Sequence, residues 1–357
     1  MYLITLATLV QTKLTTTQNP QLTSGPPYAP QVAGLGGHPT VDLDVPITAV
    51  FLFLFVLTAA THMTILQLNR RRGHKFIMSG LMFGFSMARI TTCIMRIVWA
   101  TRPTNIRVAI TAQVFVAAGV LLLFVINLIF AQRIVRAAHP HFGWHRAFSL
   151  AFKAVYVVIG LSLVMLITCT VQSFYTLDTN TRRIDRDVQI YGQVFYAFVS
   201  FLPIALVLAA LVVPRTTPLD KFGSGRFRTK VCVLLLSAVL LCLGASFRAG
   251  TNIKSPRPLD DPAWYHSKAC FYIFNFTVEL LVLVMYAALR VDRRFHVRDG
   301  SHAPGHYSAA ARKQDEVEKD NGSGINRVSS EERTLHDVHQ SQVGLGKEGT
   351  PDEEAQI

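Results

Sequence analysis

Two charged residues lie deep inside long apolar segments of this sequence, and their types suit acid–base or ion-pair chemistry. Glu279 lies in the run FYIFNFTVELLVLVMYAAL and is the only carboxylate in any of the predicted spans, whereas Arg89 lies in the run GFSMARITTCIMRIVWA. A charged side chain at membrane depth costs roughly 2–3 kcal/mol or more unless it is paired or hydrated, so such residues mark functional sites by default. We therefore predict that Glu279 and Arg89 are catalytic residues.

The depths of these two residues allow them to meet. At 1.5 Å per residue, Glu279 lies roughly 15 Å and Arg89 roughly 16 Å below the same predicted membrane surface. The pair has two interpretations: a buried ion pair that only fixes the register of two helices, or part of a site. Burial alone would keep Glu279 protonated and able to donate a proton, whereas a close Arg89 would hold it ionised. The sequence leaves both alternatives open.

Further polar residues at similar depth predict a pocket around the pair. Some share a helical face with Arg89 or with Glu279, and the glutamines among them need hydrogen-bond partners in a dry medium. We expect this pocket to open toward the non-cytosolic side of the membrane. The predicted substrate-binding residues are Arg96, Gln113, Gln172, Gln193, Tyr196, Tyr272 and Asn275.

The elements that must position these residues are seven apolar segments. Half of the 357 residues are hydrophobic and only 16% are charged, which is typical of a membrane protein. Each segment has about 20 residues, enough to cross ~30 Å of hydrocarbon as a helix. The sequence therefore predicts an all-α, seven-helix transmembrane bundle with spans at residues 47–68, 76–100, 108–130, 154–174, 190–213, 231–249 and 269–289.

The formal net charge of +13 orients this bundle. Arginine and lysine are concentrated in the alternate loops that follow the first, third, fifth and seventh spans. The positive-inside rule then puts the N-terminus outside or in the lumen and the C-terminus in the cytosol. The distribution argues against nucleic-acid binding and favours membrane lipid as a partner. We expect a multi-pass protein of the endoplasmic reticulum or another endomembrane, with the plasma membrane as the alternative; the oligomeric state stays open.

The rest of the chain predicts little further chemistry. Residues 1–46 are expected to form a disordered non-cytosolic segment, residues 47–290 the transmembrane domain, and residues 291–357 a disordered cytosolic tail. The five cysteines lack metal-ligand spacing, and we expect neither a metal nor a cofactor. The seventh span has no lysine for a retinal Schiff base. No pair of spans shows the Gly or Pro interruptions typical of inverted-repeat transporters.

Three runs of the sequence resemble a known family. They are GPPYAPQVAGLGGHPTVDLDVPITAVFLFLF, NRRRGHKFIMSGLMFGFSMARITTCIMRIVWATRP and FNFTVELL, and the resemblance extends over about residues 26–298. It is to a fungal family of multi-pass membrane proteins of unknown function, which is similar to the membrane-bound terpene cyclases of meroterpenoid pathways, the ascofuranone type. The resemblance implies closure of an epoxidised farnesyl chain on an aromatic polyketide, and hence a hydrophobic prenylated substrate. It supplies no catalytic residues.

Three functions therefore remain in view. A membrane cyclase needs an acid to open an epoxide, an apolar cavity, and aromatic faces or dipoles that stabilise cationic character. A receptor-like protein fits the span count and the predicted orientation, whereas the lack of repeats and of broken helices disfavours a lipid or small-molecule transporter. The resemblance favours the cyclase. On that hypothesis Glu279→Gln lowers turnover while the protein still accumulates, whereas Arg89→Ala lowers expression because it leaves a buried carboxylate unpaired.

Overall fold

Five of the seven apolar runs form helical spans longer than predicted, and the second and seventh keep the predicted length. The computed structural model describes residues 25–73, 76–215, 217–297, 301 and 303–308. Its helices are α2 (Val41–Arg71), α3 (Ile77–Thr101), α4 (Ile106–Gly119), α5 (Leu121–Ala138), α6 (Pro140–Gly143), α7 (Arg146–Tyr175), α8 (Thr179–Val212), α9 (Phe227–Ile253), α10 (Lys268–Phe271), a π-helical segment (Tyr272–Thr277), α11 (Val278–Ala288) and α12 (Val291–Arg294).

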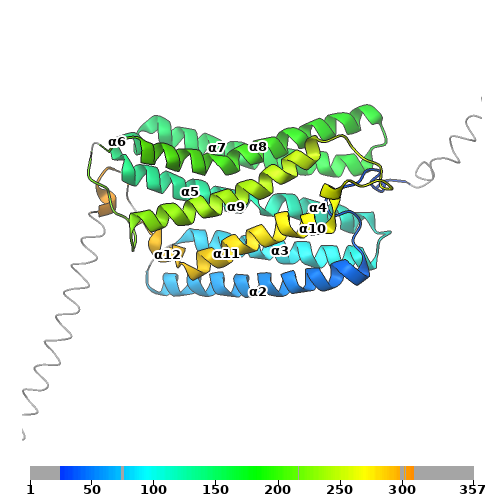
Figure 1. Ribbon diagram of the computed structural model, residues 1–357, viewed down its shortest axis with the longest axis horizontal. Coiled ribbons are helices and arrows are strands. Elements are labelled where there is room, and N and C mark those ends of the chain that lie inside the picture. The colour runs from blue at the N-terminus through cyan, green and yellow to red at the C-terminus, as the bar shows by residue number, and fades with distance from the viewer. Residues whose placement is uncertain (1–24, 74–75, 216, 298–300, 302, 309–357) are drawn as a thin grey trace, which may run out of the picture.

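The predicted all-α bundle of seven spans is confirmed. When α4 is counted with α5, and α10 with the π-helical segment and α11, the described residues contain seven helices that are long and apolar enough to cross a membrane. The protein is therefore an integral, multi-pass membrane protein. The helices run side by side, and residues 25–40 lie at the opposite end of the bundle from α12 (Figure 1). The direction of insertion stays a prediction.

The packing order determines which charged residues can meet. α2 packs along α3, α8 packs along α9, and α11 contacts both α2 and α9, so that it lies between them (Figure 1). α7 is the most peripheral span, and its side chains Leu150, Leu161 and Val164 are each more than 60% exposed. Such a face suits a surrounding of lipid. The centre of the bundle is thus formed by α3, α5, α9 and α11.

Two of the seven spans are interrupted, which the sequence analysis did not predict. The third span divides at Gly119–Val120, where α4 ends and α5 begins. In the seventh span the backbone widens to a π-helix over Tyr272–Thr277. Short π-helical turns inside α-helices occur frequently at functional sites. Both interruptions lie next to the charged residues described below.

The folded region begins earlier than residue 47. α2 starts at Val41, and Asp44, one turn in, accepts a hydrogen bond from the Thr40 N–H (2.8 Å), which has no partner within the helix. Before it, Tyr28 donates a backbone hydrogen bond to Phe174, and Val32 forms a β-bridge with Pro258. The expected disorder of residues 1–46 is therefore wrong for residues 25–46. Residues 1–24 lie outside the described residues.

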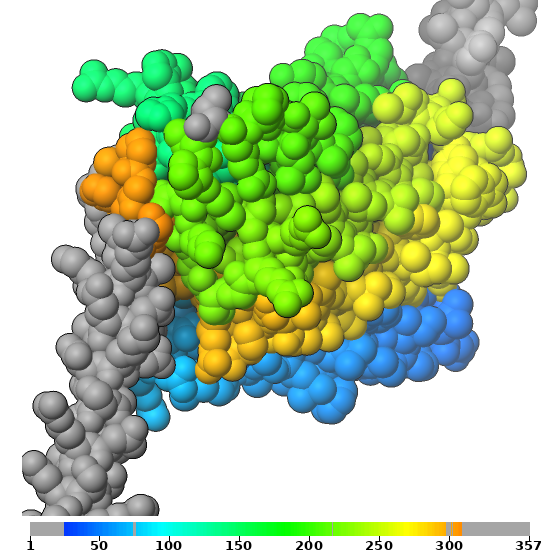
Figure 2. All heavy atoms as spheres, turned by 60° about the vertical axis from the view of Figure 1, so that its left-hand side comes forward, coloured from blue at the N-terminus to red at the C-terminus, as the bar shows by residue number. Residues whose placement is uncertain are grey.

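The folded region also extends beyond residue 290. Phe295 is fully buried, and Tyr307 packs its ring against Trp144 and Phe222. The Asp220 carboxylate accepts hydrogen bonds from the backbone N–H groups of residues 305 and 308. Residues 291–297 and 303–308 accordingly lie against the end of the bundle (orange in Figure 2). The expectation of a disordered tail is wrong for 291–297 and 303–308, and residues 309–357 lie outside the described residues.

Basic residues at this end of the bundle bind backbone carbonyls as well as setting the predicted orientation. The last carbonyls of a helix have no partner within it, and a cationic side chain can satisfy them. At helix ends the donor–acceptor pairs are Arg133 to Phe295, Arg136 to Gly143 and Arg294 to Leu289, and Lys230 donates to the Phe222 carbonyl in the loop before α9.

One carboxylate outside the spans is also fully paired. Asp292 is buried and accepts hydrogen bonds from Asn69 Nδ2 (3.0 Å) and from Arg290 Nε and Nη2 (3.1 and 3.0 Å). Burial acts to raise the pKa of Asp292, but the hydrogen bonds from Arg290 and Asn69 outweigh it and lower the pKa below its ordinary value of 3.8. The contact ties the end of α2 to α12.

Candidate functional site

Arg89 on α3 and Glu279 on α11 form a bidentate ion pair in the core of the bundle. Arg89 Nε and Nη2 lie 2.6 and 2.7 Å from the two Glu279 carboxylate oxygens, and both side chains are almost completely buried. Arg89 Nη1 donates to the Val116 carbonyl (3.2 Å), next to the break in the third span. The aromatic rings of Phe85 and Phe276 lie 5.4 and 5.5 Å from the guanidinium carbon. The predicted meeting of Arg89 and Glu279 is confirmed.

A second arginine, Arg248 on α9, shares the same carboxylate. Its Nη1 donates to Asn275 Oδ1 (3.0 Å) and lies 3.5 Å from Glu279 Oε1. The Asn275 amide in turn donates to the Phe271 carbonyl (3.0 Å). Sequence analysis missed Arg248, although it falls inside the sixth apolar run, one residue before its predicted end. We call Arg89, Arg248, Asn275 and Glu279 the inner cluster.

The π-helical segment and the start of α11 carry Tyr272, Asn275 and Glu279. Within the segment the Thr277 hydroxyl donates to the Tyr272 carbonyl (3.2 Å). Tyr272, Asn275 and Glu279 are all buried. The segment can approach α9 closely because residue 244 is a glycine: a Cβ there would lie 2.7 Å from the Phe274 carbonyl oxygen. Gly244 thereby holds Arg248 within reach of Asn275.

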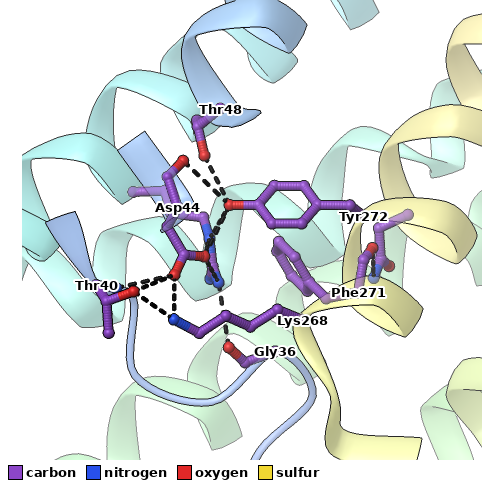
Figure 3. Close-up of polar contacts among 9 residues, drawn as sticks. Gly36, Thr40, Asp44, Thr48, Lys268, Phe271 and Tyr272 are labelled. Atoms are coloured by element: carbon purple, nitrogen blue, oxygen red, sulfur yellow. Dashed lines mark hydrogen bonds and ion pairs between the residues drawn. The ribbon is translucent and has the colours of Figure 1, made fainter. Parts of the chain in front are cut away.

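Asp44 is the centre of an outer cluster with Lys268 and Tyr272 (Figure 3), and Arg96 also belongs to it. One carboxylate oxygen accepts from Arg96 Nη2 (2.7 Å) and from the Tyr272 hydroxyl (2.8 Å), and the other pairs with Lys268 Nζ (2.5 Å). The Arg96 guanidinium carbon lies 4.1 Å from the centre of the Phe271 ring.

A glycine loop closes the outer cluster. Arg96 Nη2 also donates to the Gly36 carbonyl (3.2 Å). Gly36 has a φ of +80°, and a Cβ there would lie 2.6 Å from the Phe271 ring, so this close turn requires glycine. Sequence analysis missed Asp44, since it assigned the residue to the disordered N-terminal segment. A signal was present: an aspartate four residues after Thr40, directly before an apolar run, is typical of a helix start.

The two clusters repeat along the same pair of helices. Arg96 follows Arg89 by seven residues on α3, and Glu279 follows Tyr272 by seven on the seventh span, so the clusters lie roughly 10 Å apart along the helix axis. Each cluster contains one more cation than carboxylate. The inner has Arg89 and Arg248 for Glu279, and the outer has Arg96 and Lys268 for Asp44.

The remaining predicted site residues lie elsewhere. Gln113 and Gln172 are exposed on the outer faces of α4 and α7, and Gln193 is half-buried on α8. The buried Tyr196 hydroxyl accepts a hydrogen bond from Ser162 (3.3 Å). The structure therefore brings Arg96, Tyr272 and Asn275 to the charged clusters but leaves the three glutamines and Tyr196 apart from them. Their role in substrate binding stays a prediction.

Cations surround both carboxylates of the site. Two arginines face Glu279, and an arginine and a lysine face Asp44. The site thus offers N–H donors for a negatively charged oxygen and a carboxylate that can accept a proton. The described cavity of about 590 Å³ lies at the other end of the bundle, between Pro140, Asp220 and Pro304. The expected pocket open to the non-cytosolic side stays a prediction.

Residues 220–296 match the model of a family described as "Protein of unknown function (DUF3112)". The matched part includes α9 and the whole seventh span, and therefore Arg248, Asn275 and Glu279, but it is well under half of the chain. No curated protein and no solved structure matches the chain.

Proposed function

We propose that this multi-pass membrane protein is a terpene cyclase that closes an epoxidised prenyl chain carried by an aromatic polyketide. The resemblance described above over about residues 26–298 favours this reaction, and a membrane location suits a farnesylated substrate. The single observation that supports it most is the Arg89–Glu279 pair, which lies among aromatic rings in a dry core. Such surroundings stabilise both a developing alkoxide and a carbocation.

The ion pair changes the role that sequence analysis gave to Glu279. Its carboxylate accepts hydrogen bonds from two arginines, so in this proposal Glu279 acts as a base and does not supply the proton that opens the epoxide. In the proposed reaction, N–H groups of the Arg89 guanidinium donate to the epoxide oxygen while the C–O bond breaks and the alkene forms the new C–C bond. Glu279 takes the proton lost by the final cationic carbon and delivers it to the alkoxide. The product is an isomer of the substrate.

Microsomes that contain the protein test this proposal. We expect an epoxidised farnesyl phenol to be converted to a product of unchanged mass and different retention time, and microsomes without the protein to leave it intact. Turnover is also measured for Glu279→Asp, because aspartate keeps the charge and the basic carboxylate but changes the position of the carboxylate. If protein that accumulates in the membrane gives no isomer from any epoxidised prenyl phenol, the cyclase proposal fails.

A transporter of amphipathic molecules is the second candidate. Interrupted helices near charged residues at membrane depth are typical of transporters, and both the break at Gly119 and the π-helical segment adjoin the inner cluster. From the sequence, unbroken spans spoke against a transporter, and these interruptions remove that objection. Uptake of the same epoxide into sealed vesicles without chemical change would favour transport over cyclisation.

A further inference from the structure

The inner cluster carries an excess positive charge. Arg89 and Arg248 share one carboxylate, Glu279, and the described residues provide no second anion within ion-pair distance of either arginine. Arginine stays protonated in proteins, so this excess is fixed. An uncompensated cation in a low-dielectric surrounding is costly. The cost falls if an anion from outside the chain joins the cluster.

Arg248 has the donors to receive such an anion. In the part of the chain that the structure describes, its hydrogen bonds use Nη1 alone, which leaves the Nε and Nη2 N–H groups for another acceptor. The side chain is 10% exposed. Among the described residues, the side-chain polar atoms that are fully buried and lack a hydrogen-bond partner belong to Trp144, Tyr156 and Asp185. Within the described chain, Arg248 Nε and Nη2 lack a partner but are not fully buried. These donors therefore lie at an accessible edge of the cluster.

The position of Arg248 identifies the kind of molecule that can reach it. The residue lies five positions before the end of α9, roughly 8 Å along the helix from that end. The rings of Phe247, its neighbour in sequence, and Phe274 stack with centres 3.9 Å apart, and Leu243, one turn before Phe247, is exposed to the surroundings of the bundle. A ligand here meets apolar side chains and a guanidinium edge suited to two parallel hydrogen bonds with a carboxylate or phosphate.

We propose that Arg248 binds the anionic headgroup of an amphipathic ligand, a carboxylate, phenolate or phosphate on a long apolar chain. The anion hydrogen-bonds to Nε and Nη2 and neutralises the inner cluster, while the chain lies along the apolar surface of α9. The inference deepens the proposed function and rests on it for the identity of the substrate. Its test measures binding and needs no turnover.

The test compares oleate with methyl oleate, which differ in headgroup charge and share the same chain. Full-length protein in phosphatidylcholine nanodiscs is titrated with radiolabelled oleate in a scintillation proximity assay. We expect saturable binding that methyl oleate does not displace. Loss of a hydrogen-bonded charge pair weakens affinity by about 10–100-fold, so Arg248→Gln should weaken oleate binding by that factor. Arg248→Lys should retain part of the affinity.

Arg257→Gln is the matched control, since Arg257 lies at the same end of the bundle but is half-exposed and paired with Asp261. Its oleate affinity should change by about twofold or less. Arg248→Gln removes the excess charge, so its thermal midpoint should not lie below that of the wild type. Weaker oleate binding by this variant would then not be due to unfolding. Equal oleate affinity of wild type and Arg248→Gln, or equal binding of methyl oleate, would overturn the inference for a free amphiphile.

A second arm decides whether the anion comes from a bilayer lipid. Nanodiscs that contain phosphatidylglycerol should raise the thermal midpoint of the wild type, and not of Arg248→Gln, if a lipid phosphate occupies the site. That result supports the inference with a lipid as the ligand, even when oleate does not bind. If neither oleate binding nor the effect of phosphatidylglycerol depends on Arg248, the inference is wrong. A cyclase assay that fails leaves both readouts unchanged.

Discussion

Replacing Glu279 by glutamine is expected to destabilise the protein more than replacing Arg89. Glu279 accepts two hydrogen bonds from Arg89 (2.6 and 2.7 Å) and pairs with Arg248 at 3.5 Å. Glu279→Gln therefore leaves two arginines buried beside each other with no carboxylate. Removing one partner of a buried ion pair costs about 3–5 kcal/mol, and we expect the loss to reach this range.

Arg89→Gln should cost less, because Glu279 keeps Arg248 as its cation. What is lost is one charged partner with its hydrogen bonds, about 1.5–3 kcal/mol. This order reverses the sequence-based expectation that Arg89→Ala lowers expression while Glu279→Gln accumulates normally. The reason is Arg248, which that expectation did not include.

The assay measures the thermal midpoint of detergent-solubilised protein, with size-exclusion chromatography after heating as the readout. We expect the order wild type, Arg89→Gln, Glu279→Gln, from highest to lowest. The double variant Glu279→Gln with Arg248→Gln returns the cluster to a single excess cation, so its midpoint should lie above that of Glu279→Gln alone. A Glu279→Gln protein as stable as the wild type, or a double variant without any recovery, would refute the reasoning.

Four other outcomes can be measured with the same material. Gly244→Ala should lower the thermal midpoint by the equivalent of about 1–3 kcal/mol because the added Cβ meets a backbone carbonyl at 2.7 Å, whereas Gly250→Ala, which meets nothing within 4 Å, should not. Asp44→Asn should cost about 3–5 kcal/mol by leaving a buried arginine unpaired, while Asn at the exposed Asp42 should have little effect. The hydrogen bonds to Asp292 outweigh its burial and lower its pKa. The contribution of Asp292 to stability should therefore be complete above pH 3.8 and disappear as the pH falls through the lowered pKa. Asp292→Asn should flatten that part of the pH profile of the thermal midpoint. In sealed microsomes a C-terminal tag should be digested by added protease and an N-terminal tag protected; the opposite pattern would reverse the predicted orientation.

The apolar runs determined the fold class by themselves. The length of a hydrophobic segment and the need to pair every backbone N–H group in lipid are local properties, so seven spans follow without any knowledge of packing. The depths of Arg89 and Glu279 follow from the same runs, because the rise per residue of a helix is fixed. For this reason their meeting could be predicted as soon as α3 and α11 were assumed to touch.

Only the tertiary structure decided which other residues contact the Arg89–Glu279 pair. Arg248 reaches Glu279 because α9 packs against the π-helical segment at Gly244, and a π-helical turn has no clear sequence signal. Asp44 became part of the protein interior because capping carried α2 beyond its apolar run, toward Arg96. The glutamines were assigned to a pocket from depth alone, whereas the facing of a helix depends on its neighbours, and Gln113 and Gln172 face outward. The sequence determines how deep each residue lies along its helix. The rotation of each helix and its neighbours are determined by packing between segments that are far apart in the chain.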